Sequence, residues 1–450
     1  MTTVLSKSSL STSADTLKAL VHDVLGECAK QGATSAEASI SVGQGLTVNV
    51  RLGEVETVER NRDRGLALTV FVGQQSGSAS TSDLSPAALR ECARAAHTIA
   101  RFTAADPHSG LADPAQLAKS IPDLDLCHPW NPEAEDIIAL ARQCEDAARA
   151  VDPRITNSEG ASVYSSENLE VYGNSHGFLA ATPTTRHGIS VAVIGEDDSG
   201  MQRDYWYTAA RNRHDLEAAE AIGREAAARA LRRLGARKIS TRQTPVLFEA
   251  PVAASLVSHF VGAVRGTSLY RRASFLLDQL GQPVFASQIR LHEQPFLPRA
   301  LGSAPFDNDG VAPSNRDLVR DGVLQGYVLD VYSARKLGMA STGNAGGVHN
   351  LTLEPGRDDL PALLRRMGTG LLVTDLIGFG VNTLTGDYSR GASGFWVEGG
   401  VIQYPVEEIT IAGNLKDMYK NLVAVGSDVD IRGNIRTGSI LLESMTLAGD

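Results

Sequence analysis

Histidine and glutamate are the residue types through which this sequence could support metal-dependent hydrolysis. A zinc hydrolase helix presents two histidines on one face to bind Zn²⁺, with a glutamate beside the first that activates water. His292 is followed by a glutamate, but Pro295 and Pro298 forbid the helix that would present a second ligand, so we expect a strand-end histidine in a loop. His259 lies in the apolar helical segment Ala254–Val264, which holds no acidic residue and no second histidine. Neither segment contains a complete zinc site.

Motifs for nucleophilic and nucleotide chemistry are incomplete. The segment Gly391–Gly394 contains a serine, but its spacing differs from the Gly-x-Ser-x-Gly turn of serine hydrolases. Gly378 and Gly380 follow a strand-like run, yet the third glycine and the helix of a dinucleotide-binding motif are missing, and no Walker loop occurs. The remaining histidines have no ligand spacing and are expected at the surface or in the core: His22, His97, His108, His128, His176, His187, His214 and His349.

Composition and charge exclude several classes of protein. The 450 residues are 42% hydrophobic and 21% charged, which is typical of a globular chain with two or three domains. The formal net charge of −10 disfavours general nucleic-acid binding, because most of the surface would repel a phosphate backbone. Two basic groups are exceptions, and we interpret them as solvated helix faces or loop charges: Arg229, Arg232, Arg233, Arg237 and Lys238, and Arg271 with Arg272.

Cysteine usage and hydropathy bear on the compartment. Cys28, Cys92, Cys127 and Cys144 form no Cys-x-x-Cys pair, which favours buried free thiols in a reducing compartment. No run of eighteen or more apolar residues occurs, and the segment Met1–Ser13 is rich in serine and threonine without an apolar core. We therefore expect a cytoplasmic protein that does not contact a membrane.

The first half of the sequence contains a repeated order of elements. Amphipathic spacing and β-branched runs predict helix, strands and helix at 15–30, 38–42, 46–52, 66–72 and 86–99. The same order is predicted again at 133–150, 162–164, 169–172, 189–194 and 215–234. Leu46 matches Leu169 and Gly65 matches Gly188, each at a separation of 123 residues. The equal separation indicates two copies of one helix–sheet–helix module with the same topology.

The chain is expected to have an α+β fold in two parts. Residues 1–240 would form an N-terminal domain with modules at about 14–104 and 133–235, joined over the surface by the proline-rich segment 106–132. Residues 241–450 would form a mainly β domain. Its predicted strands are 246–249, 284–291, 323–331, 370–379, 395–398 and 408–411, and its predicted helices are 252–264, 360–367 and 414–423.

A long and unusual pattern in this second part resembles a known family. Gly386–Glu398, with the following runs Ile402–Val406 and Glu408–Met418, is similar to the signature of PmbA (TldE) subunits in the TldD/PmbA metalloprotease family, whose members have also been called modulators of DNA gyrase. Shorter runs at 270–277, 307–310, 332–338 and 341–347 support the resemblance, which covers residues from about Ala36 to the C-terminus.

The resemblance has consequences for metal binding. In this family the TldD subunit carries a His-Glu-x-x-x-His helix and a C-terminal cysteine. His259 matches the first histidine, while Phe260, Val264 and Thr437 stand at or near the positions of the glutamate, the second histidine and the cysteine. One ligand cannot hold Zn²⁺ against water. The resemblance therefore implies no cofactor in this chain, zinc in a TldD-type partner, and a peptide chamber built by the pair.

The signature also supplies candidate binding residues. We expect Gly386–Gly394 to be a loop lining the peptide chamber, because glycines let the backbone approach an extended peptide. Its candidates for contacting a peptide or the partner are Asp387, Tyr388, Ser389, Arg390 and Gly391. The alternative is a tight surface turn in which Arg390 pairs with Asp387.

Two functions remain open from the sequence. The first is a non-catalytic subunit of a TldD/TldE complex that cleaves unfolded peptides, as in peptide maturation or antitoxin degradation. The second is a stand-alone, homodimeric peptide-binding or regulatory protein, for example one that modulates DNA gyrase.

Overall fold

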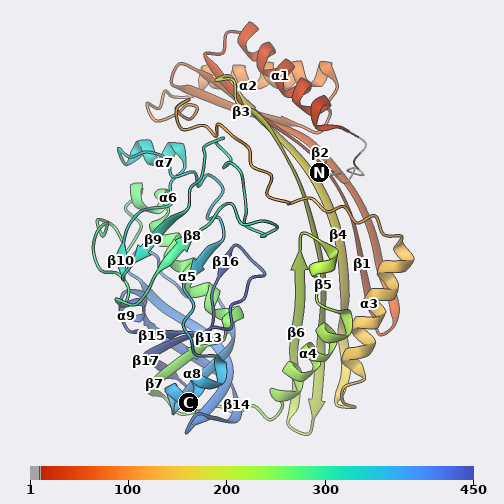
Figure 1. Cartoon of the computed structure of the whole chain (residues 1–450), viewed down its shortest axis with the longest axis vertical. Helices are drawn as coiled ribbons and strands as arrows, with labels where there is room; N and C mark the ends of the chain where they lie inside the picture. Colours follow the sequence, from red (N-terminus) through yellow and green to blue (C-terminus); the bar gives the residue numbers. More distant parts are fainter. Residues whose placement is uncertain (1–9, 11, 450) are drawn as a thin grey trace, which may run out of the picture.

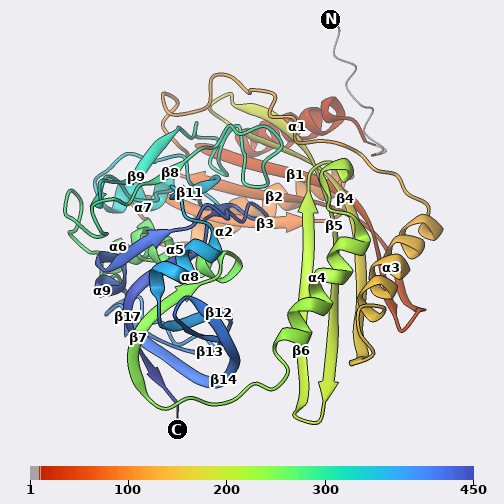
Figure 2. The ribbon, with the colours of Figure 1, turned by 60° about the horizontal axis from the view of Figure 1, so that its bottom comes forward.

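The computed structural model describes residue 10 and residues 12–449. A long curved antiparallel sheet forms one side of the molecule, and the C-terminal part of the chain lies on its concave side (Figure 1). After the last helix of the N-terminal part, one extended link carries the chain across to the first strand of the C-terminal part (Figure 2). No helix in the described ranges is long and apolar enough to cross a membrane.

The N-terminal part contains the predicted repeat. The first module has the order α1 (Ala14–Lys30), β1 (Ser35–Arg51), β2 (Glu54–Val72), β3 (Gln75–Thr81) and α2 (Pro86–Phe102). The second has the order α3 (Ala134–Arg149), β4 (Ile155–Asn174), β5 (Leu179–Asp197), β6 (Gly200–Ala210) and α4 (Ala219–Arg232), with a short 3₁₀ turn at Arg213–Asp215 before α4. The prediction of two modules with one topology is confirmed.

The two modules join through their first strands. The six strands have the order β3-β2-β1-β4-β5-β6, so β1 and β4 lie antiparallel at the centre. Gln44 of β1 pairs with Glu167 of β4, its own equivalent 123 residues later, which places a local twofold axis at this pair. A repeated module that pairs with its own copy extends one sheet and hides the edge that each copy would otherwise expose.

The prediction of separate short strands was wrong. Residues 38–42 and 46–52 fall within the single strand β1, and residues 162–164 and 169–172 fall within β4. Gly43 and Gly45 suggested a turn, but both keep their pairing with β4. At Gly45 a Cβ would lie 2.5 Å from the side-chain Oδ1 of Asn61 and 3.3 Å from the backbone oxygen of Ser165, so the neighbouring strands leave little room there.

All four helices cover one face of the sheet. Helices α1 and α2 pack on the first module, and α3 and α4 pack on the second, each pair over alternate apolar residues of the strands. Ser13 and Ser85 cap α1 and α2 by accepting hydrogen bonds from the backbone N–H three residues later. Cys28, Cys92 and Cys144 are free and buried here, as expected, while Cys127 is half-buried.

The C-terminal part is organised by two sheets around a large apolar core. One sheet has the order β14 (Val401–Asn414), β13 (Asp387–Glu398), β12 (Gly370–Ile377), β7 (Arg242–Phe248), β17 (Ile440–Ala448) and β15 (Leu422–Val425), and a β14–β17 pairing closes it into a barrel. The other has the order β10 (Val323–Leu324), β9 (Arg316–Arg320), β8 (Leu291–Glu293), β11 (Leu351–Leu353) and β16 (Ile435–Arg436). The helices are α5 (Ala250–Val264), α6 (Gly266–Tyr270), α7 (Val331–Lys336), α8 (Leu360–Met367) and α9 (Leu415–Lys420).

Several predicted strand boundaries in this part were wrong. Only Leu291 of the predicted strand 284–291 lies in a strand, and the predicted strand 323–331 is a two-residue strand, an irregular stretch and the start of α7. His292 lies inside β8 rather than in a loop. Short apolar runs give no periodicity that separates a strand from a buried loop, so their ends are set by the partners they meet.

Candidate functional site

Helix α5 carries His259, the candidate metal ligand, and most of its other side chains are apolar and buried. Pro251 lies in its first turn, where a missing N–H costs nothing, and apolar residues follow to Val264. Leu256, Val257 and Phe260 are buried in the core of the barrel domain. His259 lies at the edge of this buried surface and is half-buried.

The residues at the other metal positions are part of the core. Phe260 is fully buried, and its ring lies 5.0 Å from that of Phe285 and 6.0 Å from that of Tyr419. Val264 is also fully buried. Thr437 is buried, and its hydroxyl donates to the carbonyl of Gly438. In the described part of the chain, no three His, Cys, Asp or Glu side chains are grouped so that they could hold a metal ion. These donors do not fit a zinc site.

The segment predicted as a loop is a strand, so the prediction of a loop was wrong, while its place in a peptide chamber stays a prediction. Residues from Asp387 onward form β13, which pairs with β12 on one side and β14 on the other. Close packing requires the glycine at Gly394, since a Cβ there would lie 1.8 Å from the carbonyl oxygen of Leu372. Gly391 pairs with Ile377 and Thr410, where an added Cβ would lie 3.3 Å from Cβ of Ile377.

The alternative of a turn closed by an Arg390–Asp387 pair is also wrong. Successive side chains of a strand point to opposite faces, and Asp387 and Arg390 are three residues apart. Asp387 instead accepts hydrogen bonds from the Thr385 hydroxyl at 2.6 Å and the Asn414 amide at 3.0 Å. These bonds lower the pKa of the Asp387 carboxyl. Ser389 is exposed, like Asp387.

The strand brings two of the five predicted binding residues to His259. The His259 and Tyr388 rings pack edge to face with centroids 6.0 Å apart. Burial lowers the pKa of His259, and the nearby Arg390 charge lowers it further, so the imidazole is neutral at pH 7. Burial raises the pKa of Tyr388, although Arg390 opposes this effect. The strand and the helix thus form one polar cluster of His259, Tyr388 and Arg390, which the sequence did not reveal as a unit.

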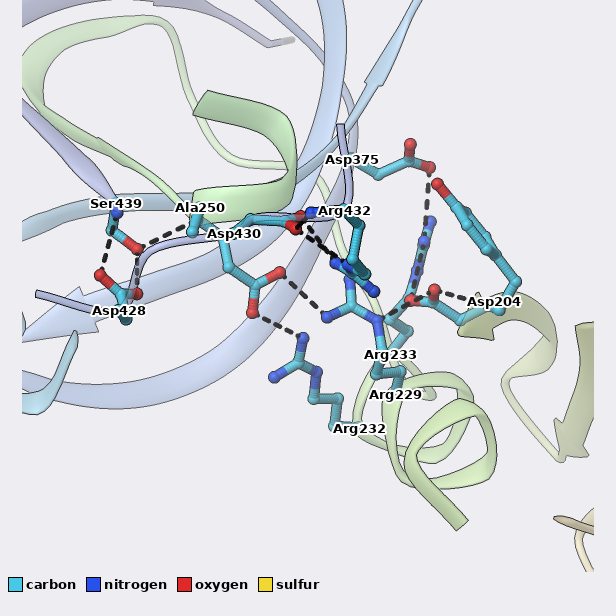
Figure 3. Close-up of polar contacts among 12 residues, drawn as sticks. Asp204, Arg229, Arg232, Arg233, Ala250, Asp375, Asp428, Asp430, Arg432 and Ser439 are labelled. Carbon is cyan, nitrogen blue, oxygen red and sulfur yellow. Dashed lines mark hydrogen bonds and ion pairs between the residues drawn. The ribbon is translucent and has the colours of Figure 1, made fainter. Parts of the chain in front are cut away.

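A buried ion-pair network holds the second module against the elements that carry this cluster (Figure 3). Arg229 of α4 contacts Asp204 of β6 at 3.2 Å and Glu249, the residue before α5, at 3.0 Å. All three side chains are at most 10% exposed. Burial alone would lower the pKa of Arg229, but the two carboxylates raise it, so it remains a cation.

Neighbouring arginines extend this network to the barrel strands. Arg233 contacts Asp204 at 3.5 Å and Asp375 of β12 at 3.4 Å, and it donates to the Ser393 hydroxyl of β13 at 2.9 Å. The interpretation of the basic group at 229–238 as solvated was therefore wrong for Arg229 and Arg233. Charged residues on a helix are usually solvated, but here the carboxylates that compensate them come from other elements.

A second clamp uses the loop before β17. Arg432 binds Asp430 through two nitrogens, donates to the Tyr207 carbonyl at 2.9 Å and lies 4.1 Å from the Trp206 ring centroid. Ser439 in the same segment donates to Asp428 and accepts the Ala250 N–H at the start of α5 (Figure 3). Both clamps fix α5 relative to the curved sheet.

A cavity of about 410 Å³ lies between the other end of the sheet and the loop at 304–308. It contains acids from both parts of the chain. The pKa of Glu37 and that of Asp307 are each raised to about 7, mainly by burial, and the nearby Asp309 contributes to both shifts. Glu37 accepts a hydrogen bond from the Tyr172 hydroxyl at 2.8 Å.

We expect the protein to lose stability as the pH rises from about 4 to about 7 because of these carboxyls. In the unfolded chain both carboxyls are ionised well below pH 6, whereas the folded chain holds their protons up to about pH 7. The unfolded state therefore binds fewer protons in this window, and the free energy of unfolding falls as pH rises. The measurement is the melting temperature against pH. Glu37→Gln should flatten the fall, and Glu56→Gln at an exposed position should not; parallel curves for the Glu37 variant and the wild type would contradict the assignment.

Comparison with known proteins shows which proteins this chain resembles. Profiles of the PmbA/TldA metallopeptidase domain 1, central domain and C-terminal domain match residues 36–100, 127–234 and 241–449. The chain is 48% identical to Metalloprotease PmbA of Escherichia coli O157:H7 over 423 residues, which are 94% of each protein. It is 48% identical over 425 residues to the Metalloprotease PmbA homolog of Haemophilus influenzae, again 94% of each.

Solved structures show the same fold. A crystal structure from Bacteroides thetaiotaomicron, described as a proposed modulator of DNA gyrase, superposes with a TM-score of 0.92 at 29% identity and covers 97% of this chain and 100% of its own. TldE from Thermococcus kodakarensis has the same fold, with a TM-score of 0.83 at 20% identity over 97% of this chain and all of its own. Since three family domains match in order along almost the whole sequence, the chain belongs to the PmbA/TldD metallopeptidase family.

Proposed function

We propose that this chain is the TldE-type subunit of a peptidase complex, in which a TldD-type subunit supplies the zinc and the two subunits together process unfolded peptides in the cytoplasm. The observation that carries the proposal is the state of α5. His259 is the one polar residue at the family's metal positions on this helix, and Phe260 and Val264 are buried in the core. In this chain α5, which corresponds to the metal-binding helix of TldD, is apolar. Such a chain is suited to binding a substrate rather than to activating water.

The buried ion pairs of this chain are consistent with a structural role in the complex. The ion pairs of Arg229 and Arg233 and the hydrogen bond from Arg432 to the Tyr207 carbonyl fix the curved sheet against the barrel without a contact to His259. The arrangement is a rigid scaffold of two modules and a barrel.

Co-expression tests this function. We expect the chain and a TldD-type subunit from the same organism to elute together from a size-exclusion column and to cleave an unfolded peptide that the chain alone leaves intact. Separate elution, with cleavage by the TldD-type subunit unchanged on addition of this chain, would contradict the proposal. Binding or regulation by this chain alone would then be the remaining function.

We expect the purified chain to contain no stoichiometric transition metal. Its α5 offers one imidazole, and a single ligand does not retain Zn²⁺ against water. The measurement is elemental analysis of the isolated chain, with His259→Ala as the matched variant. A zinc content near one per chain that disappears in the variant would show that His259 has ligands beyond those seen here.

A further inference from the structure

One half of strand β2 lies bare at the edge of the curved sheet. Strand β3 pairs with β2 only from Leu66 to Val72, so the preceding half has β1 on one side and, within the described part of the chain, no strand on the other. Every residue of this half, Glu54–Arg64, is exposed. We call Glu54–Arg64 the β2 edge.

The second module shows how the equivalent edge is covered. Thr185 of β5 lies 123 residues after Arg62 and is 1% exposed, because the connector between the modules runs beside it. Its N–H donates to the carbonyl of Leu126 at 3.0 Å, and its hydroxyl accepts the N–H of His128 at 2.8 Å. Nothing in the described chain covers the β2 edge in this way.

The repeat also shows which backbone groups of the β2 edge point outward. Arg62 pairs with Gln44 of β1 as Thr185 pairs with Glu167 of β4, so the N–H of Arg62 is directed away from β1, like that of Thr185. In an antiparallel strand this direction recurs at every second residue. The N–H and C=O groups of Arg60, Val58 and Glu56 therefore also point outward, and such a row is a template for a further strand.

The β2 edge is held in its extended conformation at both ends. At the tip of the β1–β2 hairpin, the fully buried carboxylate of Glu145 on α3 accepts the N–H groups of Leu52 at 2.9 Å and Gly53 at 2.8 Å. Arg142 of α3 donates to the Gly53 carbonyl at 2.9 Å. The pairing with β3 begins at Leu66. A strand that is already ordered loses little conformational entropy when another strand pairs with it.

The charges of the β2 edge are complementary to themselves. Glu54 and Glu56 precede Val58, and Arg60 and Arg62 follow it at the same spacing. When two such strands pair antiparallel about Val58, Val58 meets its own copy, Glu56 faces Arg60, and Glu54 faces Arg62. All these side chains lie on one face of the sheet, because side chains alternate along a strand, and opposite charges that face each other across strands are stabilising.

Val58 at the centre of this pairing is 45% exposed, which is unusual for an apolar side chain in the middle of a strand. Pairing with a second copy would cover it. A pairing shifted so that its centre is Glu59 would instead set two carboxylates against each other. The sequence of the edge therefore favours one register.

We propose that the β2 edge is an interface between two copies of this chain, which pair antiparallel about Val58 and join their curved sheets into one. The interface is a twofold one, in which the same surface of each copy contacts the other. It goes beyond the proposed function, because its partner is a second copy of this chain and not a TldD-type subunit. Pairing at a sheet edge adds strands in the plane of the sheet and leaves its concave face free.

Analytical ultracentrifugation of the full chain over a range of concentrations tests the interface. We expect a monomer–dimer equilibrium for the wild type. Glu56→Arg sets two arginines against each other at each pair with Arg60, and Arg60→Glu sets two glutamates against each other. Each single substitution should weaken the dimer about tenfold or more, because like charges then face each other.

Mixing the two variants makes the test specific. In an equimolar mixture of Glu56→Arg and Arg60→Glu chains, an arginine of one variant faces a glutamate of the other at both pairs, so the mixture should dimerise although neither variant does so alone. Glu225→Arg makes the same change of charge at an exposed position on α4 and should leave the wild-type dimer unchanged. Melting temperatures of the variants separate loss of pairing from loss of folding.

Three results would each overturn the interface: a wild-type chain that stays monomeric throughout, a dimer that Glu56→Arg leaves intact, and a mixture of the two variants that stays monomeric. All these measurements use this chain alone. Failure to assemble with a TldD-type subunit would therefore count against the proposed function and not against the β2 edge.

Discussion

Replacing Arg229 with alanine should lower the free energy of unfolding by about 3–5 kcal/mol. The substitution removes the cation that Asp204 and Glu249 share and leaves each buried carboxylate with one neighbouring arginine, Arg233 for Asp204 and Arg232 for Glu249. The Arg229 guanidinium also lies over the Trp206 ring, with its central carbon 5.0 Å from the ring centroid. Equilibrium denaturation by urea, with the transition followed by tryptophan fluorescence and circular dichroism, measures the effect.

Two further variants make the Arg229 result specific. Arg232→Ala, about one helical turn later, also removes a partner of Glu249. Because the Arg232 side chain is 34% exposed, this substitution should lower the free energy of unfolding by about 1 kcal/mol or less. Arg229→Met keeps an unbranched side chain and loses the charge, so it should be destabilising to a degree similar to alanine if the lost ion pairs dominate. A loss below 1 kcal/mol in Arg229→Ala would mean that water reaches the carboxylates readily.

Replacing Phe260 with alanine should cost about 3–5 kcal/mol. The side chain is fully buried between Phe285 and Tyr419, and its removal leaves a cavity in the barrel core. Phe260→Glu should cost more and prevent folding, because a carboxylate would be buried among aromatic rings without a partner. Denaturation of the alanine variant and soluble expression of the glutamate variant are the measurements.

The control for Phe260 is on the same helix. Ser258 is exposed, so Ser258→Ala should change stability by only a few tenths of a kcal/mol. If Phe260→Ala behaved like Ser258→Ala, the core around α5 would be more adaptable than its packing indicates. A stable Phe260→Glu variant would show that the helix can turn this position toward a polar site.

The Phe260 prediction bears on how the two kinds of subunit differ. At the position that the family resemblance gives to a water-activating glutamate, this chain has a side chain that its own fold requires. Restoring the metal residues would therefore remove part of the core. On α5, Phe260 and Val264 are buried in the core, and among the family's metal positions on this helix only His259 has a polar side chain.

The sequence by itself determined the features that depend on local periodicity. Helices α1, α2, α5 and α8 were predicted because their apolar residues repeat at helical spacing between clear start and stop signals. The two-module repeat was predicted because the equal separations of matching residues can be read from the sequence without knowing any contacts. The absence of a zinc-binding helix motif is likewise a property of spacing.

Tertiary structure alone decided which segments pair and which charges are buried. The glycine-rich run from Gly386 suggested a loop, but β12 and β14 pair with it on both sides, and at Gly394 the carbonyl oxygen of Leu372 leaves no room for a Cβ. Arg229 suggested a solvated face, but Asp204 and Glu249 reach it from β6 and from the start of α5. The His259 and Arg390 side chains of the polar cluster come from elements more than a hundred residues apart. Pairing and burial depend on neighbours that are distant in the chain, and local sequence patterns hold no record of them.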